Sequence, residues 1–471
     1  MATTEYDLIV IGAGPVGENV ADRAHQGGLS VAIVEAELVG GECSYWACMP
    51  SKTLLRAPAA RRAARAVAGA AQAVTGDIDV DALLARRDGM VHDWDDSSQV
   101  EWLRGAGIDL IRGHGRISGE REVTVTAADG AVTVLRARHA VALCTGSAAL
   151  LPEIPGLADA APWTSREATA VQSVPASLVI LGGGVVGAEM ATAFSGMGAA
   201  VTVIARSGLL GEMEPFAAEA VTDALRDAGV TIRTGAEVAQ VAREGNTVTV
   251  TLDDGSVVTG EDILVATGRM PRTDDIGAEV AGLTPGDWPD VDDSLRVRGS
   301  DWLYAVGDVN HRALLTHQGK YQARIAGDAI ARRAAGDTTD SRDWGEGAAT
   351  ADHRALPQVV FTDPEVAAVG HTAASASEAG LTVRILDEDL SAIAGAAIHA
   401  DGYAGSARAI VDADRGVLVG ATFVGPDVAE LLHAATIAIV GEVPMSRLWH
   451  AVPAYPTISE VWLRWSEAYR G

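Results

Sequence analysis

Short apolar runs alternate with helix-like segments through the first two thirds of the chain. The runs Tyr6–Ile11, Ser30–Val34, Leu178–Leu181 and Val201–Ile204 are rich in Val, Ile and Leu. Runs of this length and composition predict buried β-strands. Because a helix-like segment follows each of the first and third runs, the pattern predicts two β-α-β units, and hence an α/β fold.

The remaining pattern predicts helices, strands and one linker. Predicted helices cover residues 53–74, Leu83–Leu103, Leu315–Arg332 and Val428–Val440. Predicted strands or hairpins cover Ile108–Gly115, Val123–Thr126, Val132–Val134, Arg384–Leu386, Ala407–Val411 and Val417–Val424. Residues 334–353 are rich in Gly, Asp and Thr, and this composition is typical of a linker.

Two glycine fingerprints of the form G-x-G-x-x-G follow predicted strands. They are Gly12, Gly14 and Gly17, and Gly182, Gly184 and Gly187. One such motif is weak evidence, but two in the same strand–turn–helix context predict two dinucleotide-binding domains. Glu35 closes the strand after the first fingerprint, at the distance expected of an acid that binds a ribose. The second unit has Ala205 and Arg206 at the corresponding place, which suits a 2′-phosphate.

A cysteine pair lies between these fingerprints, in the run Gly40-Gly41-Glu42-Cys43-Ser44-Tyr45-Trp46-Ala47-Cys48-Met49-Pro50-Ser51-Lys52. If this run is one helix, both sulfurs lie on one face about a turn apart. With three cysteines in the chain, a disulfide framework is excluded, and no second Cys/His pair has zinc spacing. The pair is therefore predicted to be catalytic, and no metal is expected.

Charge and composition narrow the class of protein. The chain has 471 residues, 48% of them hydrophobic, and a formal net charge of −27, which argues against nucleic acid as a partner. It has no apolar run long enough to span a membrane and no basic, signal-like start, so a cytoplasmic protein is expected. Lys52 and Lys320 are the only lysines, so the presence of Lys52 in the cysteine motif favours a specific role for this residue.

These motifs resemble the class I pyridine nucleotide-disulfide oxidoreductases, the flavin disulfide reductases. The resemblance covers nearly the whole chain and implies FAD and NADPH as cofactors, with NADH less favoured. It implies that FAD is bound by Gly12, Gly14, Gly17, Glu35, Gly41, Glu42, Lys52, His114, Gly115, Thr145, Gly146, Ser147 and Asp308. It implies that NADPH is bound by Gly182, Gly184, Gly187, Arg206 and Gly268. Cys144 replaces the alanine usual in the family and is expected to pack as a small apolar residue.

The resemblance also implies three domains and a two-fold dimer. An FAD domain would comprise residues 1–152 and 273–345, an NAD(P)H domain residues 153–272, and an α+β dimerisation domain residues 346–471. The run from Tyr455 to Glu460 is where relatives complete the active site of the partner subunit.

Catalytic roles follow from the same resemblance. Cys48 is expected to face the flavin and Cys43 to exchange with substrate, while Lys52 and Glu189 pair beside the flavin. Relatives that reduce organic disulfides have a histidine acid–base where this chain has Tyr455, with Glu460 at the matching offset. Tyrosine is a poor proton acceptor near neutral pH. His450 is an alternative group if the loop is reshaped.

The sequence therefore predicts an FAD-dependent NADPH:disulfide oxidoreductase with an atypical substrate. Two alternatives stay open: a quinone reductase or diaphorase that passes electrons directly from flavin, and a non-catalytic redox-sensing flavoprotein. Mercury reduction is disfavoured because the chain ends without a second cysteine pair. Tyr45, Trp46, Trp449 and Trp462 either line the active-site cleft or pack in cores and interfaces.

Overall fold

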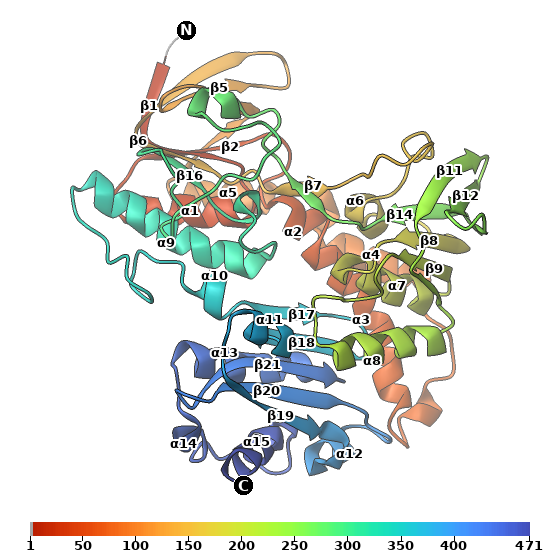
Figure 1. Ribbon diagram of the computed structural model, residues 1–471. Helices are drawn as coiled ribbons and strands as arrows, with labels where there is room; N and C mark the ends of the chain where they lie inside the picture. Colours follow the sequence, from red (N-terminus) through yellow and green to blue (C-terminus); the bar gives the residue numbers. More distant parts are fainter. Residues whose placement is uncertain (1–2) are drawn as a thin grey trace. The chain divides into compact units, whose positions relative to one another are not determined.

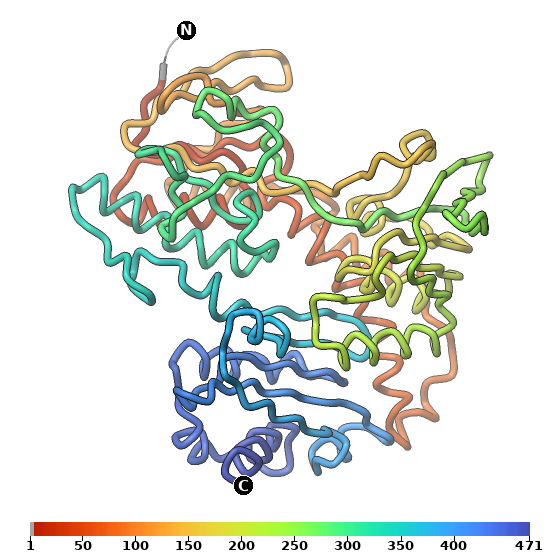
Figure 2. The backbone as a smooth tube through the Cα atoms, viewed as in Figure 1, coloured from red at the N-terminus to blue at the C-terminus, as the bar shows by residue number. Residues whose placement is uncertain are grey.

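The computed structural model describes residues 3–471, which form two compact units. Within the described residues, the first consists of residues 3–50, Asp88–Leu150 and Arg269–Asp352, and the second of Ser51–Arg87, Leu151–Gly268 and His353–Gly471. Each unit is therefore built from three separate stretches of chain, as the colours of the backbone trace show (Figure 2). The two units are described one after the other.

A seven-stranded sheet forms the centre of the first unit. Its strands are β1 (Thr3–Ile11), β2 (Val31–Glu35), β3 (Asp109–Arg112), β4 (His114–Gly119), β5 (Glu122–Thr126), β6 (Val132–Leu143) and β16 (Leu303–Ala305). The order is β3-β2-β1-β6-β5-β4, with β16 also paired to β6. β1, β2, β3, β6 and β16 run parallel, whereas β4 and β5 are antiparallel to their neighbours. The predicted β-α-β start of the chain is confirmed.

Two helices of this unit, α1 (Pro15–Gln26) and α9 (Thr316–Ala334), pack side by side (Figure 1). Their contact depends on small residues, because a Cβ atom added at Gly327 would lie 2.6 Å from the Cβ of Arg23. Beside this contact the Arg23 guanidinium binds both carboxylate oxygens of Asp328. The prediction of a helix near Leu315–Arg332 is confirmed.

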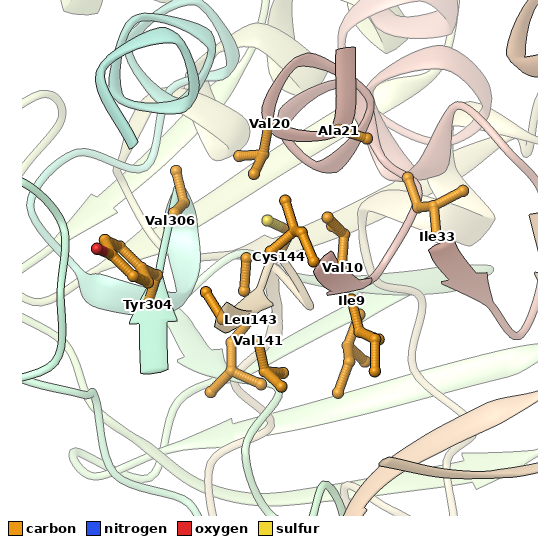
Figure 3. Packing of buried hydrophobic residues seen from close by; sticks show 14 of the residues in the cluster. Ile9, Val10, Val20, Ala21, Ile33, Val141, Leu143, Cys144, Tyr304 and Val306 are labelled. Carbon is orange, nitrogen blue, oxygen red and sulfur yellow. The ribbon is translucent and has the colours of Figure 1, made fainter. Parts of the chain in front are cut away.

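The core of this unit is continuous and almost wholly apolar. Leu8, Ile9 and Val10 of β1 are fully buried, as expected for a parallel sheet covered on both faces. Cys144 lies among these side chains, with the thiol surrounded by residues of β1, β6 and α1 (Figure 3). Burial raises the pKa of this thiol, so it stays neutral. The packing role predicted for Cys144 is confirmed.

The second unit contains three sheets. The first is parallel, in the order β10 (Thr231–Thr234), β9 (Ala200–Ala205), β8 (Ser177–Leu181) and β14 (Asp262–Val265). The second is antiparallel, in the order β11 (Val238–Glu244), β12 (Thr247–Leu252) and β13 (Val257–Gly260). The third, five-stranded and antiparallel, has the order β17 (Pro357–Val360), β18 (Glu365–Gly370), β21 (Val417–Gly425), β20 (Ser406–Asp412) and β19 (Val383–Asp389). The α/β class with a C-terminal α+β region is therefore confirmed.

The principal helices of the second unit accompany these sheets. They are α3 (Cys48–Arg65, of which Ser51 onward belongs to this unit), α4 (Val80–Met90), α7 (Val185–Gly196), α8 (Pro215–Asp227), α13 (Leu432–Val440), α14 (Met445–Leu448) and α15 (Val461–Arg470). Helix α8 begins with proline, which suits a first helical position because no amide donor is needed there. Within residues 3–471, no helix is both long and apolar enough to cross a membrane.

Three predicted helices differ from the structure. The segment Leu83–Leu103 is two helices, α4 and α5 (Ser97–Gly105), because the residues between them leave the helical conformation. His92, Asp93 and Trp94 there have φ angles of 52°, 51° and 57°, which interrupt a right-handed helix. The helix predicted over residues 53–74 ends earlier, at Arg65. The segment Val428–Val440 opens with a 3-10 turn before α13 begins.

Glu18, in the first turn of α1, has a buried carboxyl group. Its Oε1 atom is buried and has no hydrogen-bond partner among the described residues. Burial raises the pKa of Glu18 from 4.5 to about 7; the charge of Lys320 opposes this shift and that of Glu35 adds to it. The folded state therefore holds the proton more tightly than the unfolded state does.

Replacement of Gly17 by alanine tests the backbone packing behind α1. A Cβ atom at this position would overlap the carbonyl oxygen of Gly12, and steric overlap of this kind costs about 1–3 kcal/mol or more. We expect Gly17→Ala to lower the melting temperature measured by differential scanning fluorimetry. Gly14→Ala is the matched control, because its Cβ would meet only the Gly41 Cα atom, at 3.9 Å. Equal melting temperatures for Gly17→Ala and the wild type would contradict the expectation.

The pH dependence of stability tests Glu18. A raised carboxyl pKa stabilises the fold while the group is protonated, below about pH 4.5, and this contribution is lost as the pH rises to about 7. Glu18→Gln cannot ionise, so it should exceed the wild type in unfolding free energy by roughly 1–3 kcal/mol at pH 8. The advantage should shrink towards pH 5. Thermal melts at both pH values measure it, with exposed Glu244→Gln as control. A difference that does not change with pH argues against a buried, protonated Glu18.

Candidate functional site

The first fingerprint forms a tight loop between β1 and α1. Gly12 has a φ of 102°, and a Cβ atom there would overlap the carbonyl oxygen of Cys144. Gly17 is equally restricted by the carbonyl of Gly12. Gly14 is different, because its φ is −72° and no protein atom crowds its Cβ direction. Protein packing therefore demands glycine at the first and third positions, while the second position borders open space.

Glu35 ends β2 beside this loop. Its carboxylate accepts the amide hydrogen of Ala13 at 2.7 Å and that of Glu37 at 2.7 Å. Burial raises the pKa of Glu35, and these two amide bonds partly offset the shift. The main-chain carbonyl of Glu35 accepts the amide of Gly113 at 2.9 Å, which brings the start of β4, and with it His114 and Gly115, to the same edge. The structure thus brings Glu35, His114 and Gly115 to one edge of the sheet.

The cysteine motif is joined to the fingerprint by backbone contact. Gly40 is in the left-handed region, with φ 112°, and donates its amide to the carbonyl of Ala13 at 2.8 Å. A Cβ atom on Gly41 would lie 2.8 Å from the Cα of Gly14, so the two backbones can approach this closely only with glycine at position 41. This contact places the turn that carries Glu42 and Cys43 next to the first fingerprint.

The prediction that the two cysteines share one helix is wrong. Cys43 lies in α2 (Gly41–Tyr45), and Cys48 is the first residue of α3. Trp46 separates the two helices, with a φ of −137° that no α-helix tolerates. The relative position of the sulfurs is therefore set by a turn, and helical spacing does not describe it.

The break gives Cys48 a distinct electrostatic position. As the first residue of an 18-residue helix, it lies at the positive end of the helix dipole. Its sulfur is 3.3 Å from the hydroxyl oxygen of Thr316, which is the first residue of the 19-residue helix α9. Two helix amino termini therefore favour negative charge on this sulfur. Sequence reasoning missed Thr316; its place at a helix start is the only signal that the sequence offered.

A polar network joins three of the predicted FAD residues. The Ser147 hydroxyl donates to Asp308 at 2.8 Å and accepts from the Arg269 guanidinium at 2.6 Å. Arg272 donates to the Ser147 carbonyl at 3.3 Å and to Glu42 at 3.1 Å. Burial raises the pKa of Asp308, while Ser147 and Arg269 partly reverse the shift. Sequence reasoning missed both arginines, although both directly follow the stretch that contains Gly268.

Thr145 and Gly146 precede this network. The Thr145 hydroxyl oxygen is buried and has no partner among the described residues, and Gly146 has a φ of 72°. A buried hydroxyl without a partner is costly, so this loop can accept a hydrogen bond from, or donate one to, a further group.

The second fingerprint, in the second unit, repeats the geometry of the first. Gly182 has a φ of 114° and meets the carbonyl of Ala266, and a Cβ on Gly187 would overlap the carbonyl of Gly182. Gly184 caps α7, and no atom of the described residues lies within 4 Å of its Cβ direction. The contact with Ala266 also brings the stretch that ends at Gly268 alongside β8.

Arg206 follows β9 directly and is exposed. Its main-chain carbonyl accepts the amide of Gly235 at 3.1 Å, while its side chain forms no ion pair within residues 3–471. The guanidinium is therefore available to an external anion.

Lys52 and Glu189 form an ion pair within the second unit. The Lys52 Nζ atom lies 2.7 Å from Glu189 Oε2. Glu189 is 3% exposed, so its charge depends on this partner and on the main-chain amide of Phe361, which donates to Oε1 at 3.0 Å. The pairing predicted from the sequence is present.

Tyr455 and Glu460 are not brought together as an acid–base pair. Tyr455 is 77% exposed, whereas Glu460 is 8% exposed and accepts from Arg464 at 2.8 Å. His450 is also exposed, and no hydrogen bond links either ring to Glu460 in the described chain. A cavity of about 170 Å³ contains Tyr455 and Glu460 in its lining, together with Trp449 and Trp462.

The other predicted aromatic residues belong to the first unit. Tyr45 is fully buried and donates to the carbonyl of Val39 at 3.2 Å, which is a packing role. Trp46 contacts it with ring centroids 5.6 Å apart. Trp449 and Trp462, in contrast, belong to the lining of the cavity described above.

These residues fit two dinucleotides. In each fingerprint the middle glycine borders open space at a helix amino terminus, where backbone amides and the dipole favour a pyrophosphate. The buried, unpartnered hydroxyl of Thr145 and the carboxylates of Glu35 and Asp308 provide polar groups on the first side. Across residues 3–471 no group of three or more His, Cys, Asp or Glu is arranged to hold a metal ion.

Comparison with known proteins gives the same assignment. The sequence pattern of the pyridine nucleotide-disulphide oxidoreductases matches residues 6–326, and that of their dimerisation domain matches residues 356–465. The mercuric reductase of Staphylococcus aureus is 30% identical over 97% of this chain and 81% of its own length. The dihydrolipoyl dehydrogenase of Haloferax volcanii is 33% identical over 97% of this chain and 94% of its own length.

Solved structures share the fold along the whole chain. The Cu(II) complex of the HOCl-induced flavoprotein disulfide reductase RclA from Escherichia coli has a TM-score of 0.84 at 24% identity, covering 99% of both chains. LpdA from Mycobacterium tuberculosis has a TM-score of 0.83 at 25% identity, also covering 99% of both.

Together these matches identify a flavoprotein oxidoreductase that acts on a disulfide and uses FAD and a pyridine nucleotide. The match to the dimerisation domain indicates a homodimer. The chain belongs to the class I pyridine nucleotide-disulfide oxidoreductases.

Proposed function

We propose that the protein is an NADPH-dependent disulfide oxidoreductase whose Cys43–Cys48 pair carries electrons to an atypical acceptor. The observation that carries this proposal is the position of Cys48, at the amino ends of α3 and α9 and 3.3 Å from the Thr316 hydroxyl. A sulfur in this position is stabilised as a thiolate, which is the reactive form in disulfide exchange. Bound FAD would supply two-electron transfer between the nicotinamide and the sulfur pair.

The cysteines have different proposed tasks. Cys48, fixed at a helix start, is the sulfur held next to the flavin, and Cys43, on the short helix α2, exchanges with the acceptor disulfide. Reduction of the acceptor breaks its sulfur–sulfur bond and forms one between Cys43 and Cys48. The pair gives up two electrons, and the two leaving thiolates take one proton from the Cys43 thiol and one from solvent. Lys52, oriented by Glu189, provides a fixed positive charge for the flavin.

The residues proposed to bind the cofactors lie in both units. For FAD they are Gly12, Gly14, Gly17, Glu35, Gly41, Glu42, Lys52, His114, Gly115, Thr145, Gly146, Ser147 and Asp308. For NADPH they are Gly182, Gly184, Gly187, Arg206 and Gly268. The proposed domains are 1–152 with 273–345 for FAD, 153–272 for NADPH, and 346–471 for dimerisation.

Preference for NADPH is supported by Arg206 and its neighbour. Ala205 ends β9, where an acid would bind the ribose 2′-hydroxyl of NADH, and the exposed Arg206 follows it without an ion pair in residues 3–471. A guanidinium is the side chain best suited to a phosphate, because it can donate two parallel hydrogen bonds.

The atypical acceptor is supported by the C-terminal segment. Glu460 accepts a hydrogen bond from Arg464, and Tyr455 is exposed. Within residues 3–471, therefore, no carboxylate orients a base at this place. We propose that the partner subunit's Tyr455 donates a hydrogen bond at the active site. Loss of a general base commonly costs ~10²–10⁴ in rate, so turnover of ordinary disulfides should be slow.

Cysteine variants test the redox function. Reduction of the wild type by NADPH should produce a long-wavelength absorbance band from the Cys48 thiolate to the flavin, and Cys48→Ser should lack it. Cys43→Ser should keep a thiolate band but lose disulfide reduction. An acceptor screen under NADPH, run on the wild type and Cys43→Ser, measures turnover alongside the spectra.

Cys144→Ala is the matched control, because this buried thiol is held neutral and should change neither the band nor turnover. A wild type without the band contradicts a flavin-coupled pair. Quinone turnover that survives in both Cys43→Ser and Cys48→Ser would instead indicate direct electron transfer from flavin.

Coenzyme preference is tested with Arg206→Ala. Loss of charge-assisted hydrogen bonds to a 2′-phosphate should raise KM for NADPH about 10- to 100-fold, while KM for NADH stays within about twofold. Steady-state kinetics with both coenzymes measure this, with the exposed Arg226→Ala of α8 as control. Equal changes for NADPH and NADH would show that Arg206 does not recognise the phosphate.

A further inference from the structure

Glu189 carries a charge in an almost closed environment. The residue is 3% exposed and lies on α7, among apolar neighbours such as Ala188 and Met190. A buried carboxylate needs donors on both oxygens to remain charged without a large free-energy cost. Lys52 provides one donor at 2.7 Å, and the main-chain amide of Phe361 provides the other at 3.0 Å.

Phe361 also contacts the other member of the pair. The Lys52 Nζ atom lies over the Phe361 ring, 5.0 Å from its centroid, which is a cation–π distance. The ring itself packs against the core formed by α3, α7 and the parallel sheet of the second unit. One residue therefore binds the carboxylate through its backbone and the ammonium through its side chain.

A second contact fixes the same segment to α3. Arg62, ten residues after Lys52 on this helix, forms an ion pair with Asp363, two residues after Phe361. Between Lys52 and Arg62, Pro58 packs closely on α7, since a Cβ atom on Gly196 would lie 2.7 Å from the Pro58 ring. Segment 361–363, α3 and α7 are thus joined by four contacts around the ion pair.

The geometry points to Phe361 as a positioning residue for Lys52. Phe361 lies outside both glycine fingerprints and outside the cysteine motif. An ammonium has three N–H donors. Glu189 takes one and the Phe361 ring occupies a second direction, so the third is left in a defined direction for the cofactor. This last step rests on the proposed function. The segment belongs to the matched dimerisation domain, so that domain takes part in orienting a residue of the cysteine helix.

The lysine content of the chain makes a direct test feasible. Lys52 and Lys320 are the only lysines, so competitive acetylation of the purified holoenzyme with trace acetic anhydride yields two side-chain rates by peptide mass spectrometry. Phe361→Leu removes the ring and keeps the amide. Loss of a partly exposed cation–π contact should raise Lys52 acetylation about two- to fivefold, while Lys320 stays at the wild-type rate. Glu189→Gln gives the larger increase expected of a fully released lysine.

Matched variants distinguish loss of the Phe361–Lys52 contact from a general loosening of the fold. Phe361→Trp restores an aromatic face and should return Lys52 to the wild-type rate. Phe216→Leu removes a comparable contact, in which the Arg408 guanidinium lies 5.2 Å from the ring, and should leave Lys52 unchanged. Melting temperatures of all variants report overall stability.

Two results overturn the assignment. One is a wild-type acetylation rate of Lys52 in Phe361→Leu, and the other is an equal rise at Lys52 and Lys320, which reports general loosening. Because acetylation requires no turnover, a failure of the proposed disulfide chemistry leaves this test intact. Conversely, loss of the band in Cys48→Ser says nothing about Phe361, so the two hypotheses fail separately.

Discussion

Close approach of backbones at glycines is the constraint on which the rest of this structure depends. At each fingerprint the first and third glycines admit no side chain, because carbonyl oxygens occupy the space where a Cβ would lie. The same requirement recurs where Gly41 meets Gly14, and that contact holds the cysteine turn against the nucleotide loop. One steric condition therefore shapes both glycine loops and also places the segment that carries Cys43 beside the first of them.

The backbone contacts also determine where helix amino termini and charged side chains lie. Helix amino termini point at Cys48 from α3 and α9, and a nearly closed environment holds the charge of Glu189 between Lys52 and the amide of Phe361. Both arrangements rely on charges that are compensated by fixed groups, so little rearrangement is needed when electrons move. Ser147, Asp308 and the two arginines around them extend the same principle to the first unit.

In the C-terminal segment, charged and polar groups are less fully compensated by fixed partners. One carboxylate oxygen of Glu460 accepts a hydrogen bond from Arg464 of α15, and the second remains buried without a partner among the described residues. Tyr455 is exposed and lines a cavity together with Trp449 and Trp462. This combination is the physical basis for the proposal of an unusual acceptor.

The sequence by itself determined the parts that depend on local spacing. The strand–glycine–helix units followed from residue type and order, because glycine is irreplaceable where backbones touch. The packing of Cys144 followed from the apolar character of its side chain, and the Lys52–Glu189 pair from the resemblance to a known family. Only the tertiary structure decided that the cysteines occupy two helices, that Thr316 contacts Cys48, and that Glu460 pairs with Arg464 instead of Tyr455. A backbone turn at Trp46 and a contact between residues as far apart as Cys48 and Thr316 leave no periodic trace in a sequence, so they emerge only once the chain is folded. Glu460 and Arg464 are four positions apart, but the exposure of Tyr455 that leaves Glu460 to Arg464 is decided by tertiary packing.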